Sequence, residues 1–510
     1  MRLAPLMKEI ETLAITGDQN GEVRSICYNS GQCEKGSLFV AIPGLRTDGH
    51  EFIGDALARG ARFIIHERDF SPPVGVTAIR VRDSRRALGR LGANFFRHPS
   101  ASLCLIAVVG TNGKTTVTYL LESIIRAAGH SVGVLGTVNY RYGEERFPAA
   151  NTTPESFEMQ RILREMVDCG VTHVVAEVSS HAIALRRVDD CAFDLGIFTN
   201  LTRDHLDYHQ TMENYFRAKS RFFTEVLPGG GKDLPRRMII NGDDPWGRRI
   251  IRQTAGGRLT YGLDNPCDVT AEPFSLSLGG IRAKVHLEGE ELDIASPLMG
   301  RFNLYNILAA VAAARAVAIP NEAIRSGIVG LSRVPGRLEK VSAAGQPAVF
   351  VDYAHTDDAL RRVLQNLSPF RTKRIITVFG CGGDRDHGKR PLMGEAATAY
   401  SDLVIVTSDN PRTEDPMEII REIETGIRTP KFSDISEFEQ QPHTKGYLVL
   451  PDRGEAIAAA IGIADTADIV LIAGKGHEDY QIIGSRKLSF DDRKIARERL
   501  ALWQTARAGS

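Results

Sequence analysis

The stretch LCLIAVVGTNGKTTVTYLLESIIRAAG, residues 103–129, decides the fold of this chain. Its first half is a short apolar run that predicts a buried strand, and its second half has apolar residues at the spacing of an amphipathic helix. A glycine-bearing turn joins the two halves. Such a turn places backbone N–H groups and the helix N-terminus where they bind phosphate. The stretch therefore predicts an α/β domain with a phosphate site.

The phosphate loop comprises Gly110, Thr111, Asn112, Gly113, Lys114, Thr115 and Thr116, and we predict that these residues bind ATP. Lys114 supplies a positive charge for the terminal phosphates, and the Thr115 hydroxyl is placed to ligate Mg²⁺. Position 108 is valine where the full phosphate-loop pattern has glycine, so this shortened variant argues against an ordinary nucleotidase. A glycine turn that only caps a helix would leave the lysine at the cap uncompensated.

The alternation of apolar runs and helical segments continues on both sides of the loop. Strand candidates are residues 37–42, 61–65, 171–178, 193–200, 237–242, 374–380, 403–410 and 469–476. This alternation predicts parallel sheets with helices on both faces. Because single cores stop growing near roughly 250 to 300 residues, we expect three domains in this 510-residue chain, at 1–99, 100–332 and 333–510. The loops after the last three runs should face one crevice, because ligands collect at the carboxyl ends of such strands.

Composition excludes several classes of protein. Hydrophobic residues make up 43% and charged residues 25% of the chain, which is the balance of a folded globular protein. The 63 Lys and Arg equal the 63 Asp and Glu, so no overall field attracts nucleic acid or an anionic membrane. The seven cysteines include no Cys-x-x-Cys pair, and no stretch approaches the roughly 20 apolar residues of a membrane helix. We expect a cytoplasmic monomer without nucleic acid or membrane insertion.

A carboxylate and several histidines follow two of the predicted strands. Glu177 ends an apolar run, where a second metal ligand belongs beside a phosphate loop. The alternative for Glu177 is a carboxylate bonded to a neighbouring backbone N–H. In the loop 202–209, TRDHLDYH, His205 is the better placed metal candidate, whereas His181 and His209 fit a surface role as well as a metal role.

Ordered motifs along nearly the whole chain resemble the Mur ligase family, the ATP-dependent amide-forming enzymes of bacterial cell-wall precursor synthesis, which are themselves similar to folylpolyglutamate synthetases. The motifs are GTNGKTT at 110–116, NTTP at 151–154, EVSSHAIALRRV at 177–188, TRDHLDYH at 202–209, AKSRFF at 218–223, GRFNLYNILAA at 300–310, VPGRLE at 334–339, VDYAHTDDAL at 351–360, FGCGGDRDHGKRP at 379–391, DNPR at 409–412 and GKGHE at 474–478. The resemblance implies a UDP-substrate domain, a central ATPase-like domain with the phosphate loop and a Rossmann-like C-terminal domain.

The resemblance also assigns roles that composition does not. Composition alone makes Lys219 a solvated helix lysine, but the family implies that CO₂ carboxylates it and that the carbamate holds a second Mg²⁺. Glu177 and His205 would complete the magnesium environment, with Thr115 serving the ion on the nucleotide. Together with Lys114, these are the expected catalytic and metal residues. Further nucleotide contacts are implied for Asn303, Asn306, Arg337 and Asp352.

Contacts with a UDP-N-acetylmuramoyl dipeptide are implied in the first two domains. They fall to Asn151, Thr152, Thr153, Ser179 and Arg187, and at the uridine end to Ser30 and the loop Leu45-Arg46-Thr47. Two positions depart from the family. Asn29-Ser30-Gly31 stands where Asp-Ser-Arg is common, and Leu185 stands where glutamine sometimes occurs.

The motif Asp409-Asn410-Pro411-Arg412 follows an apolar run and predicts which amino acid is added. A guanidinium pairs with a carboxylate through two parallel hydrogen bonds, and diaminopimelate has a distal carboxylate that lysine lacks. Arg412 therefore favours meso-2,6-diaminopimelate, and the alternative is a surface arginine after a proline turn. The family implies that Arg385 and Asn410 assist at that carboxylate, and that Gly474 and Glu478 hold the distal amine.

These residues, together with the family resemblance, imply an ATP-dependent amide ligase. The D-glutamyl γ-carboxylate of UDP-N-acetylmuramoyl-L-alanyl-D-glutamate would attack the γ-phosphate of ATP, and an amine would then displace phosphate from the acyl phosphate. The sequence does not identify the base that deprotonates the amine. Three alternatives remain. They are a counterpart that adds L-lysine, a folylpolyglutamate-type ligase, which should not need a UDP-binding domain or DNPR, and a nucleotide-regulated binding module, which explains only residues 110–116.

Overall fold

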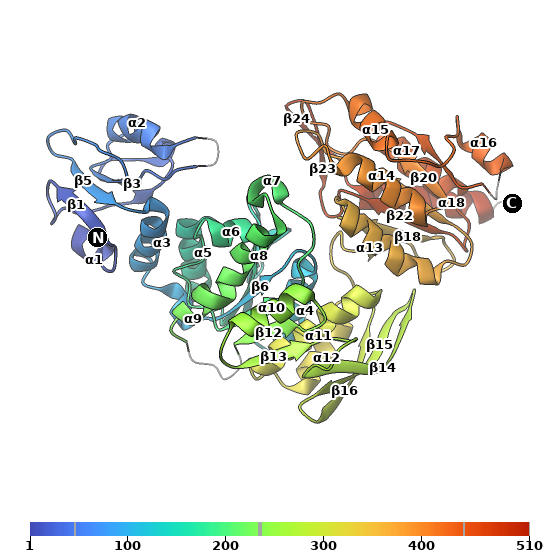
Figure 1. Ribbon diagram of the computed structural model, residues 1–510, viewed down its shortest axis with the longest axis horizontal. Helices are drawn as coiled ribbons and strands as arrows, with labels where there is room; N and C mark the ends of the chain where they lie inside the picture. Colours follow the sequence, from blue (N-terminus) through green and yellow to red (C-terminus); the bar gives the residue numbers. More distant parts are fainter. Residues whose placement is uncertain (45–46, 233–236, 442–443, 509–510) are drawn as a thin grey trace.

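The computed structural model describes residues 1–44, 47–232, 237–441 and 444–508, and Figure 1 shows three lobes that follow one another along the chain. Each lobe has its own β-sheet, with strands inside residues 12–81, 104–296 and 339–473. The protein is therefore a three-domain α/β protein, as the alternation of apolar runs predicts. Leu45 and Arg46, predicted at the uridine end, lie outside the described residues.

The first lobe is a small sheet flanked by short helices. It contains α1 (Leu3–Leu6), β1 (Thr12–Thr16), β2 (Ile26–Cys27), β3 (Leu38–Val40), α2 (Ile53–Ala58), β4 (Phe63–His66), β5 (Thr77–Val81) and α3 (Ser84–Phe95). The sheet order is β1-β5-β4-β3-β2, and only β1 runs antiparallel to its neighbour. The strands β3 and β4 are buried along their whole length, as their continuous apolar runs predict.

The central lobe carries the phosphate loop. It contains β6 (Cys104–Val109), α4 (Lys114–Ala127), β7 (Val132–Leu135), β8 (Asn139–Tyr142), β9 (Glu145–Pro148), α5 (Ser156–Asp168), β10 (His173–Val178), α6 (Ser180–Ala184), β11 (Leu195–Phe198), α7 (Leu206–His209), α8 (Met212–Arg221), α9 (Leu227–Gly229), β12 (Met238–Asn241), α10 (Pro245–Gln253), β13 (Arg258–Tyr261), β14 (Val269–Ser277), β15 (Gly280–Leu287), β16 (Glu290–Ser296), α11 (Arg301–Ala316) and α12 (Asn321–Gly330). Its sheet order is β16-β15-β14-β13-β12-β11-β6-β10-β7-β8-β9.

The middle of this sheet is parallel, as predicted, but antiparallel strands extend both edges. Strands β8 and β9 continue from β7 on one edge, and β15 and β16 continue from β14 on the other. These extensions are not among the strands predicted from the sequence. The strands β15 and β16 alternate between buried and exposed residues because one face of this edge is left open to solvent.

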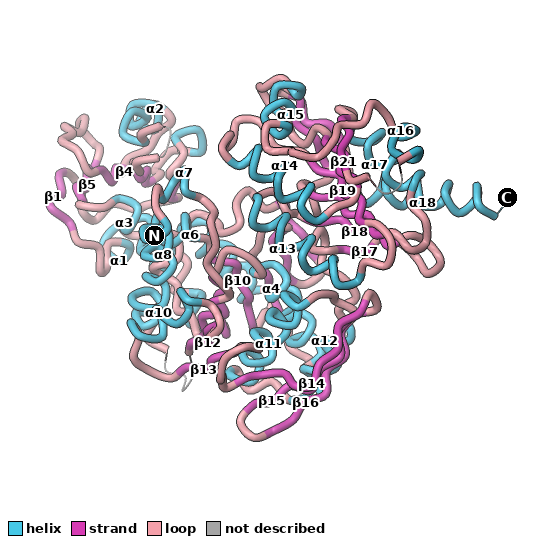
Figure 2. Tube along the Cα trace, turned by 45° about the vertical axis from the view of Figure 1, so that its right-hand side comes forward, coloured by secondary structure: helices cyan, strands magenta, loops and turns pink. Residues whose placement is uncertain are grey.

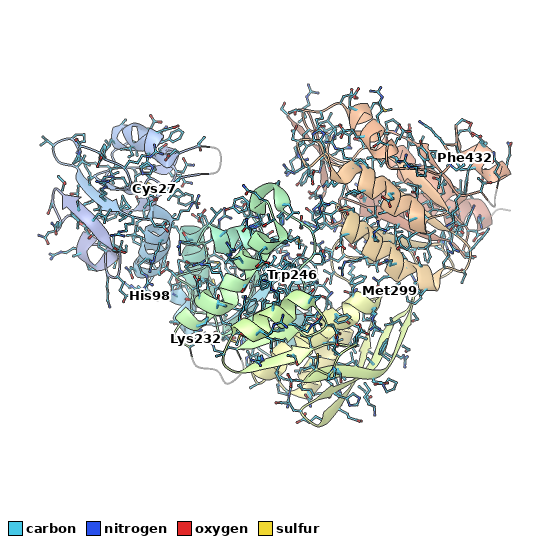
Figure 3. All side chains as sticks on the ribbon, in the orientation of Figure 1. Cys27, His98, Lys232, Trp246, Met299 and Phe432 are labelled. Atoms are coloured by element: carbon cyan, nitrogen blue, oxygen red, sulfur yellow. The ribbon has the colours of Figure 1, made fainter. Side chains whose placement is uncertain are left out.

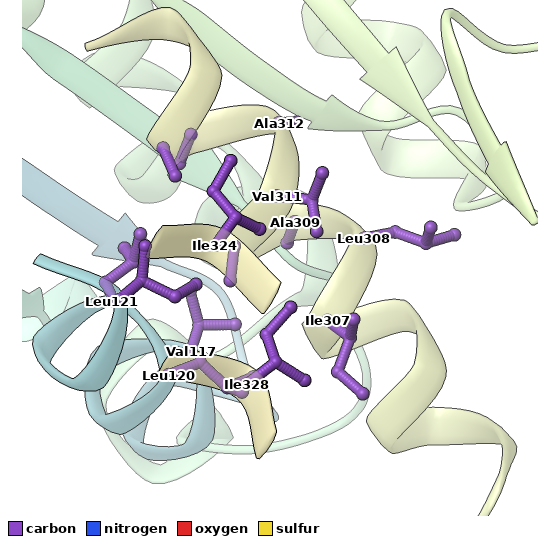
Figure 4. Packing of buried hydrophobic residues seen from close by; sticks show 14 of the residues in the cluster. Val117, Leu120, Leu121, Ile307, Leu308, Ala309, Val311, Ala312, Ile324 and Ile328 are labelled. Atoms are coloured by element: carbon purple, nitrogen blue, oxygen red, sulfur yellow. The ribbon is translucent and has the colours of Figure 1, made fainter. Parts of the chain in front are cut away.

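Helix α4, whose first residue is Lys114, is fixed by an apolar core. Figure 4 shows Leu120 and Leu121 of α4 beside Ile324 and Ile328 of α12, and all four side chains are buried. Burying one such side chain contributes about 1.5–3 kcal/mol. The core therefore holds the N-terminus of α4, and with it the phosphate loop, in a defined place.

The C-terminal lobe is a second helix-covered sheet. It contains β17 (Glu339–Lys340), β18 (Ala348–Asp352), α13 (Asp357–Leu367), β19 (Ile375–Phe379), α14 (Lys389–Tyr400), β20 (Leu403–Val406), α15 (Pro416–Glu424), α16 (Ile435–Gln440), β21 (Gly446–Val449), α17 (Arg453–Ile463), β22 (Ile469–Ala473), β23 (Tyr480–Ile483), β24 (Arg486–Ser489) and α18 (Asp492–Ala508). The order is β17-β18-β22-β19-β20-β21, parallel from β18 onward. Apolar clusters on its two faces join it to the helices that surround the strands in Figure 2.

Met299, labelled in Figure 3, ties the central lobe to the C-terminal lobe. It stands between β16 and α11 of the central lobe, yet its buried side chain belongs to the apolar cluster that includes Leu338 and Phe350. Close by, the backbone N–H of Arg301 donates to Asn366 Oδ1 of α13 at 3.0 Å. The two lobes are thus packed together at this junction. Across the described ranges, no helix has the length and apolarity that crossing a membrane requires.

Candidate active site

Glycine is required at two positions of the phosphate loop. A Cβ on Gly110 would lie 1.8 Å from Thr199 Oγ1, and a Cβ on Gly113 would lie 2.4 Å from Asn306 Oδ1. Gly113 also has φ +86°, a backbone conformation that side chains disfavour. Thr199 Oγ1 then donates to the Asn112 carbonyl at 2.6 Å. Neighbouring elements therefore constrain the shape of the loop, since Thr199 directly follows β11 and α11 carries Asn306.

The Lys114 side chain folds back onto this loop. Its Nζ donates to the carbonyls of Gly110 and Thr111 at 3.0 and 2.9 Å. Desolvation lowers the pKa of Lys114, and the Glu177 and Asp204 carboxylates oppose that shift. The cation is therefore held at the N-terminus of α4, where a nucleotide's terminal phosphates would replace the carbonyls as partners.

Glu177 and Thr115 supply neighbouring oxygen atoms beside the loop. Glu177 is buried at the end of β10 and accepts hydrogen bonds from Thr115 Oγ1 at 3.1 Å and from Thr137 Oγ1 at 2.9 Å. It also accepts from the Thr137 backbone N–H at 3.1 Å, which is the arrangement given as the alternative to metal binding. Glu177 therefore accepts from a backbone N–H and also lies beside the Thr115 hydroxyl. A carboxylate and a hydroxyl are hard oxygen ligands of the kind Mg²⁺ takes.

Lys219 is not a solvated helix lysine. Its side chain is buried in α8, and Nζ donates to the Gly110 carbonyl at 2.8 Å and lies 4.7 Å from the centre of the Tyr215 ring. Burial lowers the pKa of Lys219 well below its usual value, and the Lys114 charge adds to that fall while Asp204 opposes it. Lys219 therefore reaches the phosphate loop from α8 with an amino group whose neutral form is favoured.

The three candidate histidines are close together but face different partners. His205 has φ +54° and lies 3.4 Å from the Asp204 carboxylate, and its ring centre is 4.9 Å from that of His181. His209 instead pairs with Ser180 Oγ at 2.9 Å. Desolvation lowers the pKa of both His205 and His209 to about 4. Within the described residues, no three His, Cys, Asp or Glu side chains form a metal cluster by themselves.

The four residues predicted to make further nucleotide contacts are placed differently. Asn306 Nδ2 donates to Asn303 Oδ1 at 3.0 Å, so the two buried amides form a chain that reaches the loop at Asn306. Arg337 crosses from the C-terminal lobe and donates from Nη2 to Thr115 Oγ1 at 3.2 Å. Asp352 is turned toward its own lobe, where it accepts from the Leu338 backbone N–H at 2.5 Å. Burial raises the pKa of Asp352.

Most of the predicted dipeptide contacts form one network next to Glu177. Thr153 Oγ1 donates to the Glu177 carbonyl at 2.9 Å and accepts from the Ser179 N–H at 3.1 Å, while Arg187 donates to the Thr153 carbonyl at 3.2 Å. Thr152 reaches the same carboxylate environment through a hydroxyl contact of 3.1 Å with Thr137. The exposed Asn151 precedes them in the chain.

Ser30 lies apart from that network, in the first lobe. It begins a short 3₁₀ turn, and the Asn29 side chain accepts from the Gly31 N–H at 3.0 Å. Asparagine therefore caps this turn where the family commonly has aspartate, because either side-chain oxygen can accept that hydrogen bond. Thr47 is described, but the two loop residues before it are not.

A cavity of about 530 Å³ opens between the central and C-terminal lobes. Of the residues predicted to bind the amino acid, it is lined by Arg385, Asp409, Asn410, Arg412, Gly474 and Glu478, while Pro411 does not line it. The loops after β19, β20 and β22 thus face one crevice. His205 and His181 enter the same cavity from the central lobe.

The Arg412 loop is held by backbone contacts with the hairpin β23–β24. Arg412 has φ +53°, its N–H donates to the Ile482 carbonyl at 3.1 Å, and its guanidinium donates to the Gly383 carbonyl at 2.7 Å. Gly474 has φ +118°, and a Cβ there would lie 2.6 Å from Asp409 Oδ2. The cavity wall therefore needs glycine at this point.

Several residues that line the cavity have no individual role predicted from the sequence. They include Asp204, Tyr353, His355, Lys389 and Tyr480. His355 Nδ1 is 2.8 Å from the Tyr353 carbonyl, and Lys389 Nζ donates to the His355 carbonyl at 2.9 Å. The sequence could have indicated His355 by its position, because it lies just after the apolar run that becomes β18, where ligands of parallel sheets collect.

Comparisons with known proteins agree over nearly the whole chain. The family descriptions "Mur ligase family, catalytic domain", "Mur ligase middle domain" and "Mur ligase, glutamate ligase domain" match residues 22–96, 108–314 and 336–476. A UDP-N-acetylmuramoyl-L-alanyl-D-glutamate--2,6-diaminopimelate ligase of Geobacter sulfurreducens is 48% identical over 498 residues, which is 97% of this chain and 98% of that protein.

Solved structures show the same architecture. The structure of a UDP-N-acetylmuramoyl-L-alanyl-D-glutamate--2,6-diaminopimelate ligase has a TM-score of 0.69 at 32% identity and covers 99% of each chain. The MurF ligase of Thermotoga maritima in complex with ADP has a TM-score of 0.60 at 20% identity, covering 96% of this chain and 99% of that one, and shares the fold. On its sequence and its structure, this chain belongs to the Mur ligase family.

Proposed function

We propose that this protein is an ATP-dependent ligase that joins meso-2,6-diaminopimelate to UDP-N-acetylmuramoyl-L-alanyl-D-glutamate in peptidoglycan precursor synthesis, releasing ADP and phosphate. The observation that carries the proposal is the cavity between the lobes, which is lined by both a guanidinium, Arg412, and a carboxylate, Glu478. Diaminopimelate has both a carboxylate and an ammonium at its distal centre. The names of the diaminopimelate-adding relatives support the same substrates.

In the first step, the D-glutamyl γ-carboxylate attacks the γ-phosphorus of ATP, and the bond to the β,γ-bridging oxygen breaks to release ADP. Both reactants are anionic, so positive charge is needed between them. Lys114 and the N-terminus of α4 supply it, and Arg337 stands next to Thr115 on the same side of the loop. The product is an acyl phosphate.

We assign two Mg²⁺ ions to this site, because Thr115 and Glu177 bring a hydroxyl and a carboxylate oxygen together beside the phosphate loop. Thr115 would hold the ion on the nucleotide, and Glu177, His205 and a carboxylated Lys219 would hold the second. Bound Mg²⁺ supplies charge neutralisation between phosphate and carboxylate oxygens. Lys219 meets the chemical requirement for carboxylation, since its buried amine is desolvated and therefore able to add to CO₂ with loss of one proton.

In the second step, the neutral amine of diaminopimelate attacks the acyl carbon, the amide C–N bond forms, the C–O bond to phosphate breaks, and the amine nitrogen loses one proton as phosphate leaves. Of the residues along the cavity, Arg412, Arg385 and Asn410 would orient the distal carboxylate, while Gly474 and Glu478 would hold the distal ammonium. Asp409 and Pro411 shape that loop. The reacting amine then points toward the phosphate loop across the cleft.

The remaining assignments follow from the same reaction. Asn303, Asn306 and Asp352 would support the nucleotide, Thr153, Ser179 and Arg187 the muramoyl dipeptide, and Ser30 the uridine end. In the proposed division of the chain, the nucleotide would be bound by the domains at 100–332 and 333–510, the dipeptide by the domain at 100–332, and the uridine end by the domain at 1–99. We propose that the protein acts as a monomer. We propose that the reaction takes place in the cytoplasm, where ATP and UDP-linked precursors would be its substrates.

Phosphate release from ATP tests this function directly. We expect release only when both the UDP-linked dipeptide and meso-diaminopimelate are present, with L-lysine a much poorer second substrate. Faster turnover with L-lysine would assign the lysine-adding counterpart. Turnover with a folate substrate in place of the UDP-linked dipeptide would assign a folylpolyglutamate-type ligase, and release that ignores both substrates would leave only a nucleotide-binding module.

Replacing Arg412 with alanine should raise the KM for diaminopimelate about 10- to 100-fold, because a hydrogen bond between charged groups contributes about 1.5–3 kcal/mol. Turnover of L-lysine should hardly change, since lysine has no distal carboxylate. Steady-state kinetics with both amino acids measures the split. Arg421→Ala, at an exposed position of α15, is the matched control. An equal loss for both amino acids would contradict the assignment of Arg412.

A further inference from the structure

The buried Lys475 lies behind the wall of the cavity. Its side chain is 0% exposed, and Nζ donates to Asn410 Oδ1 at 3.1 Å and lies 3.3 Å from Glu478 Oε2. Both partners line the cavity, whereas Lys475 does not. Burying an ammonium is unfavourable unless its partners compensate. The lysine is therefore matched to these two side chains.

The hydrogen bonds around Asn410 fix which way its amide points. Its Oδ1 accepts from Lys475 Nζ and, at 2.9 Å, from the Ile482 backbone N–H. An ammonium and a backbone N–H only donate, so the oxygen and not the nitrogen must face them. Nδ2 then donates to Glu478 Oε2 at 2.9 Å. The second N–H of this amide is the one that a ligand in the cavity can use.

Glu478 is fixed in the same way. Its Oε2 accepts hydrogen bonds from Asn410 and Lys475. Among the described side chains these are its donors, so Oε1 is left to accept from a ligand. Burial raises the pKa of Glu478, the Lys475 charge opposes that rise, and Asp409 adds to it. Other ionisable groups that face Glu478 are Tyr353, Arg453 and Tyr480. Lys475 thus favours the ionised carboxylate.

We infer that Lys475 is a positioning residue for the incoming amino acid, because it orients the Asn410 amide and the Glu478 carboxylate so that the cavity presents an N–H donor beside an anionic acceptor. This pair is complementary to a carboxylate and an ammonium on one carbon atom, as at the distal centre of diaminopimelate. The distal end of lysine offers only the ammonium. Lys475 therefore also contributes to the choice between the two amino acids. The inference rests on the proposed function.

The test replaces Lys475 with methionine, which keeps the length of the side chain and removes its charge. Lys487→Met is the matched control, because Lys487 is exposed on the neighbouring strand β24. We expect the KM for diaminopimelate to rise about 10- to 100-fold, the loss that removal of charged hydrogen bonds produces. The KM values for ATP and the UDP-linked dipeptide should not change, and Lys475→Arg should restore part of the diaminopimelate affinity.

Hydroxylamine, used in place of diaminopimelate, traps the acyl phosphate as a hydroxamate and reports the first step alone. Lys475→Met should form hydroxamate at the wild-type rate. On the acidic side of the pH profile, Lys475→Met should lose kcat/KM for diaminopimelate at a higher pH than the wild type does. The sign follows because Glu478 without Lys475 holds its proton to higher pH, and protonated Glu478 cannot pair with an ammonium.

Three outcomes decide the matter. An unchanged KM for diaminopimelate in Lys475→Met overturns the inference while leaving the proposed function intact. Equal losses of amide and hydroxamate formation, with no shift of the pH profile, also overturn it, because the lysine then acts only on stability. Wild-type protein that forms hydroxamate but never consumes diaminopimelate refutes the proposed amino acid, and the inference falls with it.

Discussion

Lys114→Ala should lower the rate of ADP release at least about 10³-fold, which corresponds to about 4 kcal/mol of transition-state stabilisation. The reason is the place of the ammonium, which already bridges the Gly110 and Thr111 carbonyls at the start of α4. Of the described lysines, Lys219 also donates to the Gly110 carbonyl, but only Lys114 donates to both carbonyls. A coupled assay of ADP in the presence of all substrates measures the effect.

Folding controls separate this loss from collapse of the loop. Lys114→Ala should keep the far-UV circular dichroism of the wild type and its affinity for the UDP-linked dipeptide. Lys340→Ala, at an exposed position of β17, is the matched control and should turn over normally. Residual ADP release above about a tenth of the wild-type rate would contradict the role given to Lys114.

Lys219→Ala should also abolish turnover, and short carboxylates such as formate or acetate should restore part of it. In the wild type, Lys219 Nζ lies 2.8 Å from the Gly110 carbonyl oxygen, so the substitution leaves a space beside that oxygen. A small carboxylate in that space would take the place of the carbamate oxygens. Initial rates measured against carboxylate concentration give the rescue.

Direct detection of the carbamate completes this test. Wild-type protein in ¹³C-bicarbonate should show a carbamate carbon by NMR that Lys219→Ala lacks. Chloride at equal ionic strength is the control for the rescue, since it supplies charge screening without ligand oxygens. A Lys219→Gln variant with normal turnover, or a wild-type protein without the carbamate signal, would contradict the proposal.

Local patterns in the sequence predicted much of the fold. The apolar runs that become β6, β10, β11, β19, β20 and β22 were recognised because a strand buried on both faces needs a continuous apolar stretch. The antiparallel edge strands were missed, because half-buried alternation over β15 and β16 is weaker than a continuous run. Glycines 110 and 113 could be placed in a loop, but not the Thr199 and Asn306 side chains that press against them.

The sequence indicates which residues gather around the phosphate loop and the cavity, but not which side chains they contact. Glu177 could be proposed as a ligand, yet its bond to the Thr137 N–H depends on a strand crossover that no short motif encodes. Lys475 stands inside the quoted motif GKGHE, but its importance rests on contact with Asn410, which lies 65 positions away in the chain. Interactions over such separations come from the tertiary fold.

Met299 makes the central and C-terminal lobes depend on each other during unfolding. Its side chain is part of the buried cluster of the C-terminal lobe, so melting that lobe alone would expose apolar surface on the central one. Apolar surface exposed in this way adds to the heat capacity of unfolding. The stability of the C-terminal lobe is therefore shared with the lobe that carries the phosphate loop, and heating should melt the two as one cooperative unit.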